Sequence, residues 1–169
     1  YVYTIFLRPP SFILWFARQA GIVGSINLLH WDKIKNTDAI ETYILFLNAV
    51  IEEFIVKSKN LPGMTRAWRF AKDHRAIGLG VLGYHSYLQR NLIPFESLAA
   101  KGKNYEIFKT ISERADKASR WCHDSLGYTS IREGYANTTQ MAIAPTKSSS
   151  FILGQVSMGI EPIKSNYFI

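Results

Sequence analysis

Cysteine is nearly absent from this sequence: Cys122 is the only one among 169 residues. A single thiol excludes an internal disulfide, a cysteine-rich metal site and a dithiol redox reaction carried out by this chain alone. Trp121 and His123 flank the cysteine, but adjacent residues of a helix point in different directions, so the three do not form a compact reactive group. We therefore expect Cys122 to be a packed core residue.

Long hydrophobic runs are also lacking. The most apolar stretch, residues 1–16, is interrupted by Arg8 and two prolines and is followed by Arg18, which leaves it short of the ~20 residues that cross a bilayer. It has neither the leading positive charge nor the small-residue cleavage site of a signal peptide. We expect no membrane association. The chain begins with Tyr1 rather than methionine, which favours a fragment or a processed product.

Acidic residues are few relative to basic ones, with 13 Asp and Glu against 20 Lys and Arg and a formal net charge of +7. Such a surplus attracts polyanions, phosphorylated small molecules or an acidic partner without choosing among them. The basic residues are densest at 66–75, where a solvated face is the commoner outcome. The alternative function is a basic nucleic-acid-binding or interaction module that would use Arg66, Trp68, Arg69 and Lys72 to stack bases and meet phosphates.

What remains is the composition of one globular domain, 47% hydrophobic and 14% aromatic, which is long enough to enclose a core. Apolar residues at helical spacing predict helices over 37–59, 64–74, 84–90 and 104–126. Short apolar or β-branched runs predict strands at 21–31, 75–83 and 138–144, with another beginning at 166–169. We expect connections at 91–102 and 128–137 and a turn at 158–162. Strands and helices therefore alternate, as in an α/β protein.

Three glycines spell a dinucleotide-binding pattern, G-x-G-x-x-G, at Gly78, Gly80 and Gly83. That fingerprint requires a strand before the glycines and an acidic residue closing a second strand about 20 residues later. Here the apolar stretch overlaps the glycines, and the next acid, Glu96, lies in a proline-containing connection. We instead expect these glycines to mark places where another part of the backbone approaches closely.

The stretch 141–154 reads as a strand, a turn and a helix. Its first four residues form an apolar run bounded by Pro145, which predicts a brief buried strand ending at Ala144. Small hydroxyl residues follow, and these favour helix starts because their oxygens accept from the free amides of the first turn. The apolar residues 151–153 would then pack the new helix against a core.

A helix start of this kind can hold an anion, because its first amides are unpaired and the peptide dipoles add roughly half a positive charge. The sequence predicts a phosphate site made of Thr146, Lys147, Ser148, Ser149 and Ser150, in which each hydrogen bond to a charged oxygen contributes about 1.5 to 3 kcal/mol. An ordinary helix cap with spare serines is the alternative. The preceding strand favours the ligand site, because ligands of α/β proteins gather at the carboxyl ends of strands.

Four stretches together carry a family resemblance. They are Gly-Ser-Ile-Asn-Leu from Gly24, His-Arg-Ala-Ile-Gly-Leu-Gly-Val-Leu-Gly from His74, Ala-Ile-Ala-Pro-Thr-Lys-Ser-Ser-Ser from Ala142, and Gly-Ile-Glu-Pro from Gly159. In this order and spacing they resemble the large subunit of ribonucleotide reductase, particularly the phage-encoded aerobic type. The resemblance extends over residues 21–169, whereas residues 1–20 are atypical of the family.

The resemblance implies that residues 21–169 form part of the ten-stranded α/β catalytic barrel of a ribonucleoside-diphosphate reductase, incomplete in this chain. That enzyme reduces ribonucleotides to deoxyribonucleotides by radical chemistry, in the synthesis of DNA precursors. The glycine-rich segment would be a barrel strand. The turn at Thr146, Lys147, Ser148, Ser149 and Ser150 would bind the diphosphate of the substrate.

Departures from the family pattern indicate that the chain is inactive alone. A redox cysteine of the family is expected six positions before Asn27, and Gly21 occupies that place. The loop that carries the thiyl radical is missing, and the tyrosine pair and the tail cysteines would lie beyond Ile169. We therefore expect no catalytic residue in this chain.

The resemblance also implies what the whole enzyme would need. Its partners are a ribonucleoside diphosphate, the remaining part of the large subunit and a small, radical-generating subunit that contains a metal, with a dithiol as reductant. For this fragment we expect no bound cofactor or metal, no membrane and no specific nucleic acid. The expected location is the cytoplasm, that of the host if the chain is phage-encoded.

Overall fold

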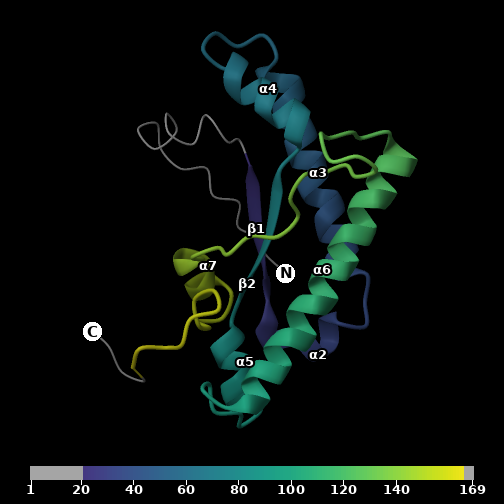
Figure 1. Ribbon diagram of the computed structural model, residues 1–169. Helices are drawn as coiled ribbons and strands as arrows, with labels where there is room; N and C mark the ends of the chain where they lie inside the picture. Colours follow the sequence, from purple (N-terminus) through teal and green to yellow (C-terminus); the bar gives the residue numbers. More distant parts are fainter. Residues whose placement is uncertain (1–20, 166–169) are drawn as a thin grey trace.

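The computed structural model describes residues 21–165 (Figure 1). The atypical segment 1–20 and the strand expected at 166–169 lie outside the described residues, so both stay predictions, as does the domain boundary at residue 21. The described elements, in chain order, are β1 (Ile22–Asn27), η1 (Leu28–His30), α2 (Trp31–Ile34), α3 (Ala39–Ser58), α4 (Thr65–His74), β2 (Ile77–Leu82), α5 (Tyr84–Arg90), α6 (Leu98–Leu126) and α7 (Lys147–Ile152).

β1 and β2 form a parallel two-stranded sheet, in register from Ile22 opposite Ile77 to Asn27 opposite Leu82. The strand expected at 21–31 is therefore shorter than predicted. It ends at Asn27 because the side chain of this residue accepts a hydrogen bond from the amide of Leu29 at 3.0 Å, which starts the 3-10 turn of η1. The strand expected at 75–83 is confirmed as β2, and the glycine pattern lies in it and at its end.

The strand expected at 138–144 is instead an extended edge segment along β2. The amides of Ile77 and Leu79 donate to the carbonyls of Thr139 and Gln140, but only Met141 forms a ladder bridge, with Leu79. The expectation of a buried run was wrong, because Ile143 is 85% exposed. A continuous strand cannot extend further, since Pro145 has no N–H to donate.

The close approaches expected at the glycines are present along this edge. A Cβ atom added to Gly78 would lie 2.6 Å from the Cβ of Ala142, and one added to Gly80 would lie 2.9 Å from that of Ala144. Real side chains do not tolerate such distances without displacement. The glycines therefore allow the edge segment to lie directly against β2, as the sequence predicted.

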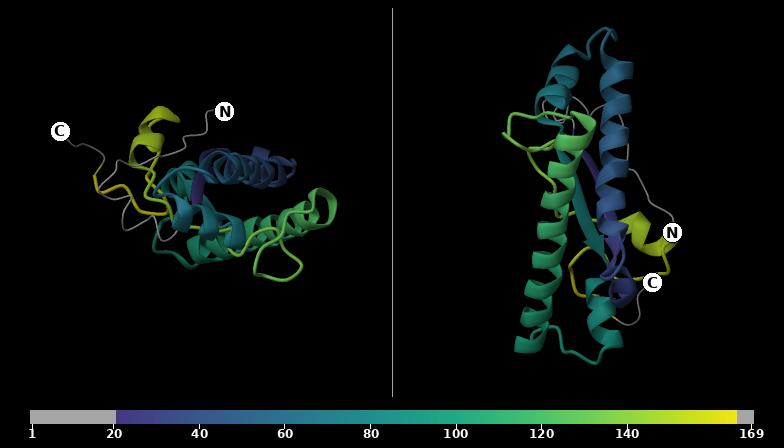
Figure 2. Two further views of the ribbon diagram at one scale, coloured as in Figure 1. Left: turned by 90° about the horizontal axis from the view of Figure 1, so that it is seen from above. Right: turned by 90° about the vertical axis from the view of Figure 1, so that its right-hand side faces the viewer.

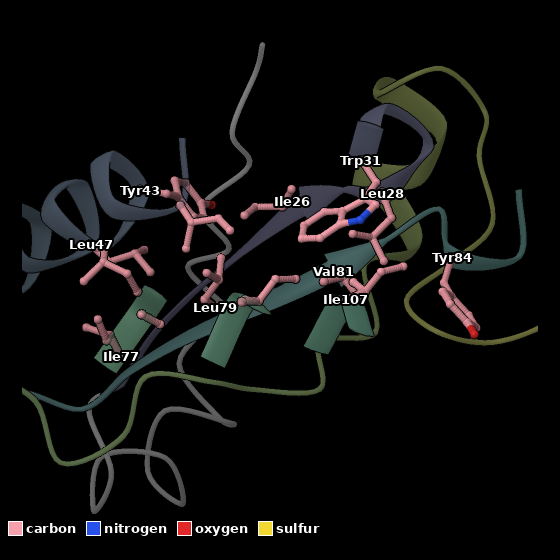
Figure 3. Packing of buried hydrophobic residues seen from close by; sticks show 14 of the residues in the cluster. Ile26, Leu28, Trp31, Tyr43, Leu47, Ile77, Leu79, Val81, Tyr84 and Ile107 are labelled. Atoms are coloured by element: carbon pink, nitrogen blue, oxygen red, sulfur yellow. The ribbon is translucent and has the colours of Figure 1, made fainter. Parts of the chain in front are cut away.

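α3 and α6 pack against each other and against one face of the sheet (Figures 1 and 2). The helical stripe predicted for α3 is confirmed, since Ile40, Ile44, Leu47 and Ile51 are fully buried. Figure 3 shows side chains of β1, β2 and α3 converging in this core. Cys122 is also fully buried, on the inner face of α6, as expected.

The connection expected at 91–102 ends earlier than predicted, because α6 already begins at Leu98. Ser97 caps the helix by accepting from the amide of Ala100 at 3.1 Å, in extended geometry. Gly102 lies within the helix and has open space around it among the described residues. An exposed glycine costs a helix only about 0.5 to 1 kcal/mol, so a 29-residue helix tolerates it.

A buried polar cluster joins the helices to the start of the edge segment. The side-chain amides of Asn48 in α3 and Asn137 bond each other reciprocally, at 3.1 and 2.9 Å, and both residues are fully buried. Asn137 also donates to the carbonyl of Arg75 at 2.9 Å and receives a bond from Ser119 in α6 at 2.8 Å. This cluster fixes where the chain leaves α6 and begins to follow β2.

None of the helices within residues 21–165 combines the length and apolarity needed to cross a bilayer.

Candidate functional site

The predicted phosphate turn lies at the carboxyl edge of the sheet, where β1, β2 and the edge segment all end (Figure 1). The side-chain amide of Asn27, the last residue of β1, donates to the carbonyl of Leu153 at 3.0 Å. The backbone amide of Gly83, just after β2, donates to the carbonyl of Ser157 at 2.8 Å. The chain after α7 is thus tied to both strand ends, which is where α/β proteins place their ligands.

A reciprocal serine pair strengthens this attachment. The amide of Ser86 donates to the hydroxyl of Ser157 at 3.2 Å, and the amide of Ser157 donates to the hydroxyl of Ser86 at 2.9 Å. Sequence reasoning missed both residues, because the two lie 71 positions apart and neither belongs to a local motif.

Thr146 stands at the start of α7 in the left-handed conformation, with φ of 45°. Its hydroxyl does not cap the helix. It accepts instead from the amide of Gly159 at 2.8 Å, and both residues are buried. This bond connects two of the stretches that carried the family resemblance, and its effect is to hold the shape of the turn.

The first amides of α7 are available for a ligand. Within the described residues, the N–H groups of Lys147, Ser148 and Ser149 have no protein acceptor, whereas that of Ser150 donates to the carbonyl of Thr146 at 2.9 Å. This is the pattern expected of a helix start. Carbonyls of residues 21–165 therefore do not occupy the amides that would hold an anion.

The five predicted site residues, 146–150, differ in their exposure to solvent. Lys147 and Ser148 are exposed, while Ser149 and Ser150 are 5% and 2% exposed. The hydroxyl of Ser150 donates back to the carbonyl of Lys147 at 2.8 Å. An anion arriving from solvent would meet the amides, the hydroxyl of Ser148 and the ammonium of Lys147, while Thr146 and Ser150 shape the turn.

The expectation that residues 151–153 anchor α7 in a core was wrong. Phe151 and Ile152 are 50% and 64% exposed. The turn also lies on an open surface. A nearby cavity of about 230 Å³, between α6, β2 and the edge segment, includes Ala144 and Ile160 in its lining but none of the residues 145–150.

Gly21, the expected position of a redox cysteine, is exposed just before β1. Among the described residues, a Cβ atom there would meet the carbonyl oxygen of Ala76 at 3.6 Å, which is ordinary van der Waals contact. Six residues separate Gly21 from Asn27 at the carboxyl edge, about 20 Å along a strand. The assignment of Gly21 to the redox position stays a prediction.

Burial dominates the environment of the Cys122 thiol. Burial raises the pKa of its thiol, and the nearby Arg75 offsets only part of this rise. A thiol kept protonated is a poor nucleophile and a poor metal ligand. Among residues 21–165, no group of three or more His, Cys, Asp and Glu side chains is arranged to hold a metal ion.

The alternative function, a basic nucleic-acid-binding or interaction module, stays a prediction, and the structure places its four residues of α4 in two groups. Lys72 lies over the ring of Trp68, 5.2 Å from its centroid. Arg66 and Arg69 line a separate concave surface of the same helix. The predicted group of four is thus divided between two faces.

Comparison with known proteins identifies the family. A family model described as the barrel domain of ribonucleotide reductase matches residues 23–127 and 116–169. The large subunit of ribonucleoside-diphosphate reductase from Invertebrate iridescent virus 6 is 35% identical over 149 residues, which cover 86% of this chain and 15% of that protein. The putative large subunit from Frog virus 3 is 34% identical, with 83% of this chain and 25% of that protein covered.

A solved structure agrees with these matches. The alpha subunit of the Actinobacillus ureae class Id ribonucleotide reductase superposes with a TM-score of 0.85 at 54% sequence identity, over 87% of this chain and 29% of that one. The chain spans a quarter or less of the two viral relatives. Its two-stranded sheet with an added edge segment is accordingly an unclosed part of a barrel. The chain belongs to the ribonucleotide reductase family, as part of the barrel domain of the large subunit.

Proposed function

We propose that this chain supplies the substrate-diphosphate site of a ribonucleoside-diphosphate reductase, an enzyme that makes deoxyribonucleotides for DNA synthesis. The observation that carries the proposal is the row of unoccupied amides at Lys147, Ser148 and Ser149, at the carboxyl edge of the sheet. The viral relatives are named for this reaction. Membership of their family supports the transfer of that activity to this chain.

The backbone and the side chains of the turn would have different roles in binding the phosphate. The backbone amides of Lys147 to Ser149 point where the helix dipole favours negative charge. The exposed ammonium of Lys147 and the hydroxyl of Ser148 would add charge-assisted hydrogen bonds to the phosphate oxygens. Thr146, by accepting from Gly159, keeps the turn in its binding shape before the ligand arrives.

The rest of the reaction is proposed to come from outside this chain. The remaining part of the large subunit would complete the barrel, and a small, metal-containing subunit would supply the radical. An external dithiol would supply the electrons, because Cys122 is buried and is the only thiol in the chain. Alone, the chain would bind substrate phosphate without reducing the ribose.

Titration calorimetry of the isolated chain with cytidine diphosphate tests the binding site. We expect Ser148→Ala and Lys147→Gln each to lower the affinity about 10- to 160-fold, because each removes one hydrogen bond or charge worth about 1.5 to 3 kcal/mol at a phosphate. Ser125→Ala and Lys101→Gln are matched controls, since both residues are exposed on α6. Affinity that is the same in all four variants would count against the site.

An activity assay tests whether the catalytic groups lie outside this chain. The isolated chain, mixed with a cognate small subunit, a dithiol and cytidine diphosphate, should produce no deoxycytidine diphosphate. Measurable turnover would show that this chain carries the catalytic groups that we assign to the rest of the subunit. Adding the missing part of the large subunit should restore turnover only if the phosphate turn is intact, so Ser148→Ala should lower the rate in that mixture.

A further inference from the structure

The outer face of α4 is a second feature that the phosphate turn does not explain. Residues at helical spacing along it line an open depression with a volume of about 530 Å³. They are Thr65, Arg66, Arg69, Phe70, Asp73 and His74. In Figure 1 this helix lies at the end of the molecule where β2 begins, opposite to α5. The face is therefore separate from the carboxyl edge that carries the turn.

The fully buried side chains of α4 are small, and its larger side chains are exposed or only partly buried. Ala67 and Ala71 are its buried residues, and they lie on the side that contacts α3. Large and charged side chains occupy the other sides of the helix. A helix that served only to cover the core would bury a wider apolar stripe, so the composition of α4 suits contact with something outside the described chain.

The arginines of this face lack the carboxylates that other arginines have. Arg75, Arg114 and Arg132 pair with Glu52, Glu41 and Asp116. By contrast, no carboxylate of the described residues lies within ion-pair distance of Arg66 or Arg69, which are both exposed. Asp73 is the one acidic side chain on the face, so its net charge is positive.

An aromatic platform lies beside these arginines. The rings of Phe70 and His74, one helical turn apart, stack with centroids 4.3 Å apart and planes 16° from parallel. Both rings line the open depression. Flat rings next to unpaired guanidinium groups are the combination with which proteins bind single strands, because bases stack on the rings while the cations meet the phosphates.

We propose that the outer face of α4 binds single-stranded nucleic acid without sequence preference. An acidic peptide would use the arginines but would gain nothing from the stacked rings. A free nucleotide is too short to extend along this surface, which is shallow and open to solvent. A strand suits an open face because it distributes its contacts along the helix, and the net charge of +7 favours its approach.

The test is fluorescence anisotropy of a labelled thymidine oligonucleotide, titrated with the full chain at several salt concentrations. We expect the logarithm of the affinity to fall linearly with the logarithm of salt, with a slope near −0.7 for each phosphate neutralised. The double variant Arg66→Gln/Arg69→Gln should weaken binding at least tenfold and make the slope about 1.4 units shallower. Phe70→Leu should weaken binding about fivefold or more with an unchanged slope.

Matched variants separate this site from a general effect of charge. Lys101→Gln/Lys117→Gln removes the same two charges from exposed positions of α6 and should change affinity less than about twofold. Ser148→Ala, at the phosphate turn, should leave oligonucleotide binding unchanged. An equal loss in both double variants would overturn the proposal, and so would poly-glutamate or cytidine diphosphate competing as well as an unlabelled oligonucleotide. Circular dichroism of each variant checks that the fold is retained.

Discussion

β2 and the edge segment, residues 138–144, lie side by side. β2 is buried, whereas the edge segment is partly exposed to solvent. Every residue of β2 is buried, under α3 and α6 and beside β1. In the edge segment Ile143 is 85% exposed, and beyond it Phe151 of α7 is 50% exposed. The first region is held by apolar packing, whereas the second is held mainly by single hydrogen bonds at Asn27, Gly83, Thr146 and Ser157.

The contrast indicates what each region is for. A packed core supplies most of the free energy of folding and tolerates few changes. A turn attached by a handful of polar bonds contributes less to stability, but its free amides and exposed side chains remain available to a ligand. We call β1, β2, α3 and α6 the helix-backed region, and residues 138–159 the edge region. We expect changes in the helix-backed region to alter the free energy of global unfolding. Changes in the edge region should alter local opening and phosphate affinity.

The largest effect is expected at Asn137, where the two regions meet. Asn137→Ala removes the reciprocal amide pair with Asn48 and leaves the carbonyl of Arg75 without its side-chain donor. The Asn48 side chain and the Arg75 carbonyl would then be buried without these hydrogen-bond partners. This should lower the free energy of unfolding by about 2 to 4 kcal/mol, measured by urea denaturation. Ser125→Ala, on the surface, is the control. A loss below about 0.5 kcal/mol would mean that the two regions are energetically independent.

The next effect concerns the contact between the regions. Gly80→Ala places a Cβ atom 2.9 Å from that of Ala144, which should destabilise the protein by about 1 to 3 kcal/mol and increase hydrogen exchange in the edge segment. Gly102→Ala makes the same change in open space on α6 and should stabilise it by about 0.5 to 1 kcal/mol. Effects of the same sign at both positions would contradict the close approach.

A smaller and more local effect is expected at Thr146. Thr146→Val keeps the shape of the side chain but removes the acceptor for the amide of Gly159. We expect the local opening free energy of that amide to fall by about 1 kcal/mol in hydrogen exchange, with little change in global unfolding. Thr146→Ser retains a hydroxyl and should retain protection. If Thr146→Val lowered global stability as much as Asn137→Ala, the edge region would belong to the core.

The smallest effect is a pH dependence confined to the helix-backed region. Burial raises the pKa of Glu41, but its hydrogen bonds, from Arg114 above all, outweigh this, and the pKa lies below its usual 4.5. Because the folded-state pKa is lowered, the stabilisation is present above the unfolded value and is lost as pH falls through the folded one.

Glu41→Gln should therefore be less stable than the natural protein at pH 7, by up to about 1 kcal/mol, and the difference should shrink between about pH 5 and pH 3. Thermal unfolding across this range measures it. Glu113→Gln is the control, because Glu113 is exposed and lies 4.0 Å from its lysine partner. A pH-independent difference would show that the ion pair does not titrate with folding.

Sequence reasoning succeeded where the signal was local and repeated. The stripe that includes Ile44 and Leu47 identified α3, because burial of one helical face leaves a spacing that the chain displays directly. The close contacts of Gly78 and Gly80 were also expected, since glycine inside an apolar strand commonly makes room for a neighbouring segment. A helix start near Lys147 was also expected and is present, but the proposed cause was wrong, because no hydroxyl group caps the helix.

It failed where the neighbours of a residue decide the outcome. Apolar runs at 141–144 and 151–153 were expected to be buried. Burial depends on what lies opposite, and the described chain leaves Ile143 85% and Phe151 50% exposed. The start of α6 was placed too late, because residues 98–103 were assigned to the preceding connection or left between it and the helix.

By itself the sequence determined most of the helices, the strands β1 and β2, the family and the hydroxyl-rich turn, because spacing and short motifs are properties of contiguous residues. Only the tertiary structure decided which groups of that turn remain free for an anion and which are occupied internally. Thr146 meets Gly159, Asn48 meets Asn137 and Ser86 meets Ser157 through bonds between residues far apart in the chain. Such pairings arise only when packing brings distant segments together, so no local pattern records them.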